Sequence, residues 1–335
     1  MENLVNSSPL ILVLVFLVIG FAFLMKGADF FVEGSSSIAK RLKVPPIIIG
    51  LTIVAMGTSL PETAVSVTAS LVNNNELAVS NVVGSNIFNL MVVVGVCSIL
   101  TPILVQKETI KRDIPFSMIC AFLLLGLGIL AVGDKIGMRL GHLDGIIMLG
   151  FFAGYIVAMI RSAMKARAAG KNMEIEGIEE LEEEIGILSW PKSILFIVGG
   201  ALAIAFGGDL TVDAASRIAI DLGMSQTLVG LTIVSIGTSL PELVTSVVAA
   251  RKNEVDMALG NAIGSNVFNI LMVLGIASAI SPISIITENI IDLCVLIVFT
   301  ICVWIFAGTK KKIGRIEGFS MVALYVIYAV YIIIR

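Results

Sequence analysis

The sequence carries little charge. Only 14% of its 335 residues are charged, against 57% that are hydrophobic, and its mean hydropathy is +1.03. No soluble globular domain has this composition, so we predict an all-α polytopic membrane protein embedded in a lipid bilayer. The net charge of −3 and the lack of a basic stripe argue against a nucleic-acid partner. No feature of the sequence indicates an obligate protein partner.

Soft metal ligands are also scarce. The four cysteines lie in apolar runs without a Cys-x-x-Cys pair, and we expect them to be packing residues. The single histidine, His142, leaves too few nitrogen ligands for a zinc site or a histidine proton relay. No Lys or Arg precedes the first apolar run and no Ala-x-Ala pattern follows it, so we expect a membrane helix there and not a cleaved signal.

Ten windows have the length and apolar character of membrane helices. They are 9–32, 46–72, 77–100, 113–133, 143–164, 191–215, 226–250, 256–280, 289–308 and 315–334. With the N-terminus outside, the inner loops contain 17 Lys and Arg residues and the outer segments contain 4. The positive-inside rule therefore predicts that both termini lie outside and that the acidic linker 165–190 is cytoplasmic.

The sequence matches itself after a shift of 180 residues. Between Gly50–Gly95 and Gly230–Gly275, 24 of 46 positions are identical. Each copy contains Gly-Thr-Ser-Leu-Pro-Glu, which ends at Glu62 or Glu242, and then Gly-Ser-Asn-Ile/Val-Phe-Asn, which ends at Asn89 or Asn269.

Each half contains five predicted helices, so the second half enters the membrane from the opposite side. We therefore predict ten transmembrane helices in two inverted five-helix repeats, 1–164 and 191–335, joined by the linker 165–190. The motif repeats are 50–95 and 230–275. This architecture is typical of carriers with a substrate site near the bilayer midplane.

The repeated motif places a carboxylate inside an apolar run. Pro61 and Pro241 each remove a backbone N–H and displace the carbonyl four residues earlier, which predicts broken second and seventh helices. A carboxylate at the membrane centre costs at least about 2.5 kcal/mol to insert, so Glu62 and Glu242 are candidate ligands. Further candidate oxygen ligands are Thr58, Ser59, Ser85 and Asn89 in the first half and Thr238, Ser239, Ser265 and Asn269 in the second.

An all-oxygen set favours a hard cation. Calcium accepts six to eight oxygens in flexible geometry, whereas magnesium prefers to keep its water. Two carboxylates balance one Ca²⁺. The same oxygens could instead be shared among Na⁺ ions, or the carboxylates could take up protons.

Other polar residues are expected to be structural. Small residues in membrane helices often serve close packing, which is our interpretation of Ser66, Ser246, Gly50 and Gly230. We expect structural roles for Asn86 and Asn266, and interhelical contacts are the alternative role for Asn89 and Asn269. Asp29, Glu33, Asp209 and Asp213 lie toward helix ends and could line an ion entrance, but we expect solvated or paired roles for them. Lys26 is a candidate partner of Asp29.

The paired motifs closely resemble those of the sodium/calcium exchangers of the calcium/cation antiporter superfamily, above all the compact prokaryotic and archaeal members. The resemblance covers nearly the whole chain. It implies a cell-membrane antiporter and not an enzyme, with no cofactor, in which the first and sixth helices slide across a ligand-bearing core. It also implies calcium movement driven by sodium, usually several Na⁺ for one Ca²⁺.

Carried over by position, the resemblance implies a ligand set. Glu62 and Glu242 would hold the central calcium with the backbone carbonyls of Thr58 and Thr238. The sodium sites would add Ser59, Ser239, Ser85 and Ser265 and the carbonyls of Ala55 and Ser235, while Asn89 and Asn269 would flank the centre. Some relatives, including the potassium-dependent branch, have Asp at the position of Asn269, so its amide argues against potassium co-transport.

Three other functions remain for comparison. A Ca²⁺/H⁺ antiporter on the same fold would cycle the two glutamates through protonation. The neighbouring hydroxyls favour sodium but do not decide between the two, so this antiporter is the open alternative. An intramembrane aspartyl protease would use Asp29 and Asp209, but Phe206 occupies the first place of the Gly-x-Gly-Asp pattern. A passive channel fits inverted repeats with broken helices less well than a carrier does.

Overall fold

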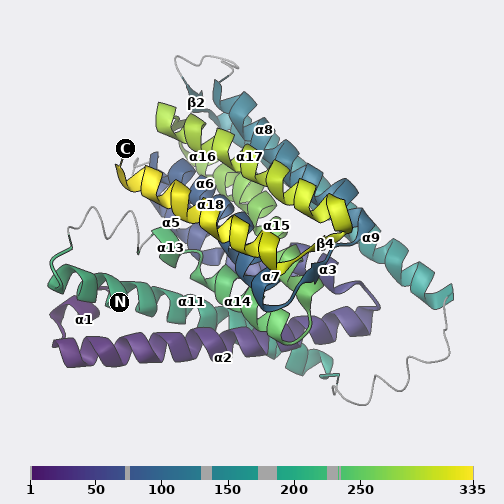
Figure 1. Cartoon of the computed structure of the whole chain (residues 1–335), viewed down its shortest axis with the longest axis horizontal. Helices are drawn as coiled ribbons and strands as arrows, with labels where there is room; N and C mark the ends of the chain where they lie inside the picture. The colour runs from purple at the N-terminus through teal and green to yellow at the C-terminus, as the bar shows by residue number, and fades with distance from the viewer. Residues whose placement is uncertain are drawn as a thin grey trace.

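The chain folds as a bundle of long apolar helices (Figure 1). The computed structural model describes residues 2–71, 76–129, 138–172, 187–224, 233 and 235–334. Within these ranges, eight helices are long and apolar enough to cross a membrane: Leu10–Leu42, Ala78–Leu100, Thr109–Ile129, His142–Ala168, Trp190–Asp221, Val255–Ile280, Thr287–Lys310 and Arg315–Ile334. Each of the eight falls on one of the ten predicted windows.

The elements follow the same order in both halves of the chain. The first half contains α1 (Glu2–Ser7), α2 (Leu10–Leu42), α3 (Pro46–Ile49), η1 (Gly50–Val54), α4 (Ala55–Thr58), α5 (Leu60–Leu71), α6 (Glu76–Phe88), η2 (Asn89–Val93), α7 (Val94–Leu100), β1 (Ile103–Leu104), η3 (Thr109–Asp113), α8 (Ile114–Ile129), β2 (Arg139–Leu140) and α9 (His142–Asn172). The second contains α11 (Trp190–Asp221), α13 (Ser235–Gly237), α14 (Leu240–Arg251), α15 (Val255–Phe268), η5 (Asn269–Val273), α16 (Leu274–Ile280), β3 (Ile283–Ser284), α17 (Thr287–Lys310), β4 (Lys312–Ile313) and α18 (Arg315–Ile334). The η segments are single π-helical stretches, which are frequent at functional sites.

The two remaining windows are broken helices, as predicted. The second window divides into an apolar stretch, Pro46–Thr58, and α5, with the break at Ser59. At 1.5 Å per residue each piece is about 20 Å long or less, so neither spans a hydrocarbon core of about 30 Å alone. The seventh window breaks between α13 and α14, and its residues 225–232 and 234 lie outside the described residues, as does 173–186 of the acidic linker.

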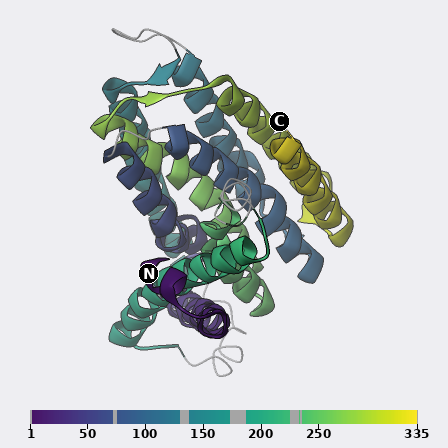
Figure 2. The same ribbon diagram turned by 90° about the vertical axis from the view of Figure 1, so that its left-hand side faces the viewer.

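Helices α2 and α11 form a layer of their own. They lie side by side along the lower edge of Figure 1, and the end-on view of Figure 2 places both below the other helices. The interface between them contains Gly20, Gly27, Gly200 and Gly207, and we call it the glycine seam. A Cβ on Gly27 would lie 2.9 Å from the carbonyl oxygen of Gly200, and a Cβ on Gly207 would lie 2.7 Å from that of Gly20. Small residues let these backbones approach closely, which is how membrane helices gain packing energy.

Above this layer, α6–α7 and α15–α16 form the centre of the protein. In each, 78% of the most apolar 18-residue stretch is buried, against 22% in α2 and 33% in α11. Two short antiparallel pairs tie the halves together at their ends. Strand β1 pairs with β4, and β2 pairs with β3, so each pair takes one strand from each half.

The glycine seam generates a stability prediction. We expect Gly200→Ala to destabilise the protein by about 1–3 kcal/mol, the usual cost of overpacking, because the new Cβ would lie 2.7 Å from the Gly27 carbonyl and the Phe31 backbone nitrogen. The measurement is the thermal unfolding midpoint in detergent. Gly199→Ala is the matched control, since a Cβ there meets nothing within 4 Å. Equal midpoints for the two variants would contradict the tight seam.

Candidate ion-binding site

The two helix breaks place equivalent residues at the centre of the protein. At Ser59 the backbone leaves the helical region (φ −85°, ψ 15°), and Ser239 does the same (φ −94°, ψ 5°). Pro61 and Pro241 are the second residues of the helices that follow, where a missing N–H is tolerated. Because neither proline can donate, the carbonyls four residues before them lose their normal helical partner.

The two glutamates are fully buried and bonded to the opposite half. Ser59 Oγ donates to Glu242 Oε1 at 2.9 Å, and Ser239 Oγ donates to Glu62 Oε1 at 3.4 Å. All four side chains have no exposed surface. The Glu62 carboxyl is also near Ser85 and Glu242, and the Glu242 carboxyl is near Ser265 and Thr58, but the Ser85 and Ser265 hydroxyls form no hydrogen bond among the described residues. The predicted carboxylates and hydroxyls therefore converge on one buried place.

Six oxygens of predicted site residues are buried with no hydrogen-bond partner among the described residues. They form three pairs related by 180 residues: Oε2 of Glu62 and Glu242, Oγ of Ser85 and Ser265, and Oδ1 of Asn89 and Asn269. Leaving a buried acceptor unpaired costs about 1–3 kcal/mol, and more for a charged group. A set of six such oxygens, two of them carboxylate, matches the hard-oxygen ligands that Na⁺ and Ca²⁺ use in proteins.

No larger group of charged ligands accompanies them. Within the described ranges, no three His, Cys, Asp or Glu side chains come together in a way that could hold a metal ion.

The amide nitrogens of Asn89 and Asn269 explain why their oxygens are free. Asn89 Nδ2 donates to Asn266 Oδ1 at 3.3 Å, and Asn269 Nδ2 donates to Asn86 Oδ1 at 3.2 Å. Asn86 and Asn266 in turn donate to each other's backbone carbonyls, both at 3.1 Å. Asn86 and Asn266 thus have a structural role, as expected, and their contacts between helices are shown by the structure. They hold the other two amides so that each Nδ2 donates a hydrogen bond, while each Oδ1 has no partner among the described residues.

The threonines at the breaks are bonded to the scaffold through their hydroxyls. Thr58 Oγ1 lies 3.2 Å from the Val54 carbonyl and 3.1 Å from Asn261 Oδ1. Thr238 Oγ1 donates to Asn81 Oδ1 at 3.3 Å. The Ala55 carbonyl accepts the Ser59 N–H at 3.1 Å. Ser235 belongs to α13, and its side chain lies outside the described part of the chain.

Sequence reasoning missed Asn81 and Asn261. Asn261 Nδ2 donates to Ser246 Oγ at 2.9 Å while its Oδ1 is bonded to Thr58 of the other half. Asn81 makes the equivalent pair of contacts with Ser66, at 3.4 Å, and Thr238. The signal was present, because this asparagine is identical in the two copies of the repeat. Ser66 and Ser246, which we expected to serve packing, accept the hydrogen bonds that these asparagines donate.

The packing role expected for Gly50 is confirmed. A Cβ there would lie 2.5 Å from the Met257 carbonyl oxygen and 3.1 Å from the Gly260 Cα. The stretch that leads to Thr58 therefore lies against the backbone of α15. Gly230 lies outside the described residues.

The structure shows a partner for Asp29, one of the acidic residues near helix ends. Asp29 is 39% exposed and pairs with Lys252 at 3.4 Å. Lys252 Nζ also donates to the Asp29 carbonyl at 3.0 Å. The paired role expected for Asp29 is confirmed, with Lys252 as the partner that the structure shows in place of the candidate Lys26.

Comparisons with known proteins agree with this geometry. A sequence profile of the family described as "Sodium/calcium exchanger protein" matches residues 12–161 and 192–334. The putative antiporter CaxA of Alkalimonas amylolytica is 37% identical over 94% of this chain and 96% of its own length. The sodium/calcium exchanger MaX1 of Methanosarcina acetivorans is 34% identical over the same shares.

The fold has a close relative among solved structures. A structure of the sodium-calcium exchanger NCX_Mj superimposes with a TM-score of 0.78 and 32% identity, over 95% of this chain and 98% of that one. It is a compact exchanger whose length matches this chain almost completely. The profile match, the two full-length relatives and the shared fold together show that this chain belongs to the sodium/calcium exchanger family of membrane antiporters.

Proposed function

We propose that this protein exchanges Na⁺ for Ca²⁺ across the cell membrane, with both ions bound between the two halves. The observation that carries the proposal is the set of six buried oxygens that have no hydrogen-bond partner among the described residues and that form three pairs 180 positions apart. Glu62 and Glu242 hold one Ca²⁺, whose charge they balance, with the backbone carbonyls of Thr58 and Thr238. Na⁺ ions use Ser59, Ser239, Ser85 and Ser265 and the carbonyls of Ala55 and Ser235, and Asn89 and Asn269 flank the centre.

Coupling follows from shared ligands. Ca²⁺ needs both carboxylates, and Na⁺ ions that occupy neighbouring sites draw on the same oxygens. Bound Ca²⁺ and bound Na⁺ therefore exclude each other. The protein changes between the state open to one side of the membrane and the state open to the other only when the buried charge is balanced. An unbalanced pair of carboxylates would repel in a medium of low dielectric constant.

Ten helices in two inverted repeats give this site its two exits. The halves are 1–164 and 191–335, with both termini outside and the linker 165–190 in the cytoplasm. The reciprocal bonds of Ser59 with Glu242 and of Ser239 with Glu62 support a pseudo-two-fold axis through the site.

The α2–α11 layer is suited to control access to the two breaks. A Cβ on Gly57 would lie 2.5 Å from Phe31 Cζ of α2, and a Cβ on Gly237 would collide with Val212 of α11. The layer therefore contacts each break through Phe31 or Val212 at a glycine, which has no side chain of its own to obstruct sliding. We propose that movement of this layer opens the site to one side of the membrane and then to the other.

The first prediction is Na⁺-driven uptake. Proteoliposomes loaded with Na⁺ and diluted into Na⁺-free buffer are expected to accumulate ⁴⁵Ca²⁺, and liposomes loaded with K⁺ are not. Glu62→Gln with Glu242→Gln should lower the rate at least about 100-fold, since two charge-assisted interactions of about 1.5–3 kcal/mol each are lost and 1.4 kcal/mol is tenfold. Asp29→Asn is the matched control, because Asp29 is exposed and paired with Lys252.

Two results would count against the proposal. Uptake driven by a pH gradient and indifferent to Na⁺ would establish a Ca²⁺/H⁺ antiporter on the same fold. Downhill Ca²⁺ flux that needs no counter-ion and does not saturate would establish a channel.

A second prediction separates the sodium ligands from the calcium ligands. Ser85→Ala with Ser265→Ala removes one neutral oxygen from each half and neither carboxylate. We expect the Na⁺ concentration for half-maximal exchange to rise about fivefold, which corresponds to about 1 kcal/mol, with a smaller change for Ca²⁺. Ion titrations of exchange rate measure both. A larger effect on Ca²⁺ than on Na⁺ would reverse the assignment.

A third prediction concerns Asn261 as a positioning residue. Asn261→Leu keeps the volume but removes the bonds to Thr58 and Ser246, two interactions of about 1 kcal/mol each. We expect the Ca²⁺ concentration for half-maximal uptake to rise about 10- to 30-fold. Thr300→Val removes an equally buried hydroxyl bond in α17 and should leave that value unchanged. If Asn261→Leu lowers the thermal stability but leaves the Ca²⁺ concentration for half-maximal uptake unchanged, the role of Asn261 is structural and not one of positioning.

A further inference from the structure

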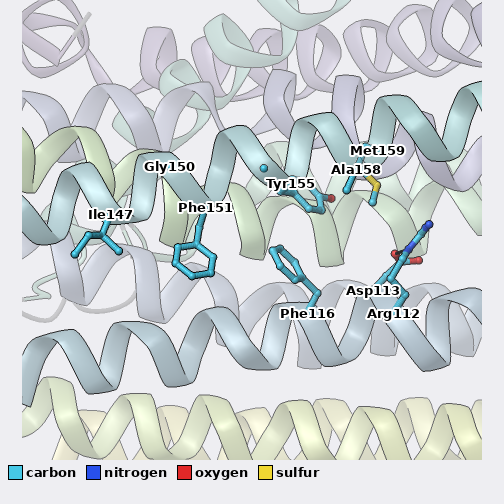
Figure 3. Close-up of a pocket in the computed structure, with 10 residues that line it drawn as sticks. Arg112, Asp113, Phe116, Ile147, Gly150, Phe151, Tyr155, Ala158 and Met159 are labelled. Carbon is cyan, nitrogen blue, oxygen red and sulfur yellow. Dashed lines mark hydrogen bonds and ion pairs between the residues drawn. The ribbon is translucent and has the colours of Figure 1, made fainter.

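A groove lies between α8 and α9, apart from the ion site (Figure 3). Its volume is about 490 Å³, and its walls are mainly apolar, with Phe116, Ile147, Phe151, Tyr155 and Met159 among them. Ile147 and Phe151 are 38% and 47% exposed. In a protein of this class an apolar surface on the outside of the bundle faces lipid, so the groove opens toward the acyl chains.

The length of the groove corresponds to one leaflet. Its α9 wall runs from Ile147 to Met159, which at 1.5 Å per residue is about 18 Å. Half of a hydrocarbon core is about 15 Å thick. The groove is therefore long enough for the acyl chain of one lipid. Because its α9 wall is centred in the predicted membrane window 143–164, a chain that enters beside Arg112 extends past the bilayer midplane.

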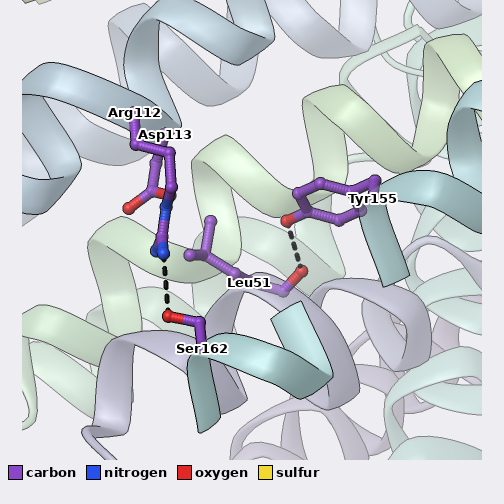
Figure 4. Close-up of polar contacts among 5 residues, drawn as sticks. All are labelled: Leu51, Arg112, Asp113, Tyr155 and Ser162. Atoms are coloured by element: carbon purple, nitrogen blue, oxygen red, sulfur yellow. Dashed lines mark hydrogen bonds and ion pairs between the residues drawn. The ribbon is translucent and has the colours of Figure 1, made fainter. Parts of the chain in front are cut away.

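The interfacial end of the groove is polar. Arg112 and Asp113 lie there together, with Arg112 Nε 2.6 Å from Asp113 Oδ1 and Arg112 Nη1 2.8 Å from Ser162 Oγ (Figure 4). The Arg112 side chain is 39% exposed, so its remaining N–H groups can reach a ligand. The Asp113 side chain is only 2% exposed, so Asp113 orients Arg112 from below the surface and leaves the guanidinium as the group that faces a ligand.

The charges around this end favour an anion. Lys111, Arg161 and Lys165 are all exposed. The last two continue the groove face of α9, three and seven residues beyond Ala158. With Arg112 they give four basic groups, against the two acids Asp113 and Glu108. Basic pockets between membrane helices on the cytoplasmic side are suited to anionic lipid head groups.

We propose that this groove binds one anionic phospholipid from the leaflet on the Arg112 side of the membrane. One acyl chain lies along α9 against Phe116 and Phe151, and the phosphate is bound by Arg112. Phosphatidylglycerol combines the features that the groove and its basic end call for: an acyl chain and a head group with one net negative charge.

The inner wall of the groove connects to the transport machinery. Tyr155 stacks on Phe116 with ring centroids 5.3 Å apart, and its hydroxyl donates to the Leu51 carbonyl at 3.0 Å (Figure 4). Leu51 belongs to η1, seven residues before Thr58. A bound acyl chain would therefore lie one hydrogen bond away from the broken helix that carries the first ligand cluster.

Native mass spectrometry of the detergent-purified protein with added phosphatidylglycerol tests the proposal. We expect one phosphatidylglycerol to be retained per chain. Gly154→Leu should reduce this adduct at least fivefold, because a Cβ at Gly154 meets nothing within 4 Å and a larger side chain fills the groove without disturbing the fold. Arg112→Gln should have a similar effect through loss of the phosphate contact.

Matched controls make the outcome specific. Gly199→Leu introduces the same side chain in equally open space on α11, and Lys312→Gln removes an exposed charge from β4, so both should retain the lipid within twofold of the wild type. Phosphatidylethanolamine should be retained at least fivefold less than phosphatidylglycerol, and glycerol phosphate, which lacks the acyl chain, should not bind.

Three results would overturn the proposal. The first is equal retention by the wild type and Gly154→Leu. The second is equal retention of phosphatidylethanolamine and phosphatidylglycerol. The third is binding of glycerol phosphate at the same concentration, which would identify a free-phosphate site. None of these measurements depends on ion exchange.

Discussion

Two carboxylates buried in the centre of an apolar protein impose the main constraint on this structure. Glu62 and Glu242 have no exposed surface, and one oxygen of each has no hydrogen-bond partner among the described residues. A charge in such surroundings is costly unless other groups compensate for it. The surrounding hydroxyls and amides offer part of that compensation, and in the function that we propose a bound cation supplies the rest. An ion carrier requires buried groups that are more stable with a cation bound between them than without one.

The protein meets this constraint with contacts that occur in pairs, one supplied by each half. Ser59 and Ser239 exchange bonds with the opposite glutamates, and Asn86 and Asn266 exchange bonds with each other. The glycine seam of α2 and α11 and the paired strands at the ends are reciprocal in the same way. Because neither half can complete the site alone, a change in their relative position alters the ligand set. This makes the geometry of the site sensitive to the packing of the halves, which is useful in a carrier.

Much of this could be predicted from the sequence because it depends on local patterns. Membrane helices follow from apolar length, and the breaks follow from Pro61 and Pro241, whose effect reaches only four residues back. The bridges made by Asn81 and Asn261 could not be predicted in the same way. They lie in central helices that are apolar on nearly every side, so periodicity does not indicate which way a polar residue points. Lys252 was missed as the partner of Asp29 because 223 positions separate the two residues.

The sequence by itself determined the membrane class, the duplication and the oxygen-only chemistry of the candidate site, since composition and a repeated motif carry that information directly. The tertiary structure decided which oxygens meet, that the amide nitrogens of Asn89 and Asn269 are occupied while their oxygens are not, and that α8 and α9 leave a groove with Arg112 at its end. These features depend on how helices far apart in the chain pack against each other. That packing is set by the sum of many small contacts and not by any one local pattern.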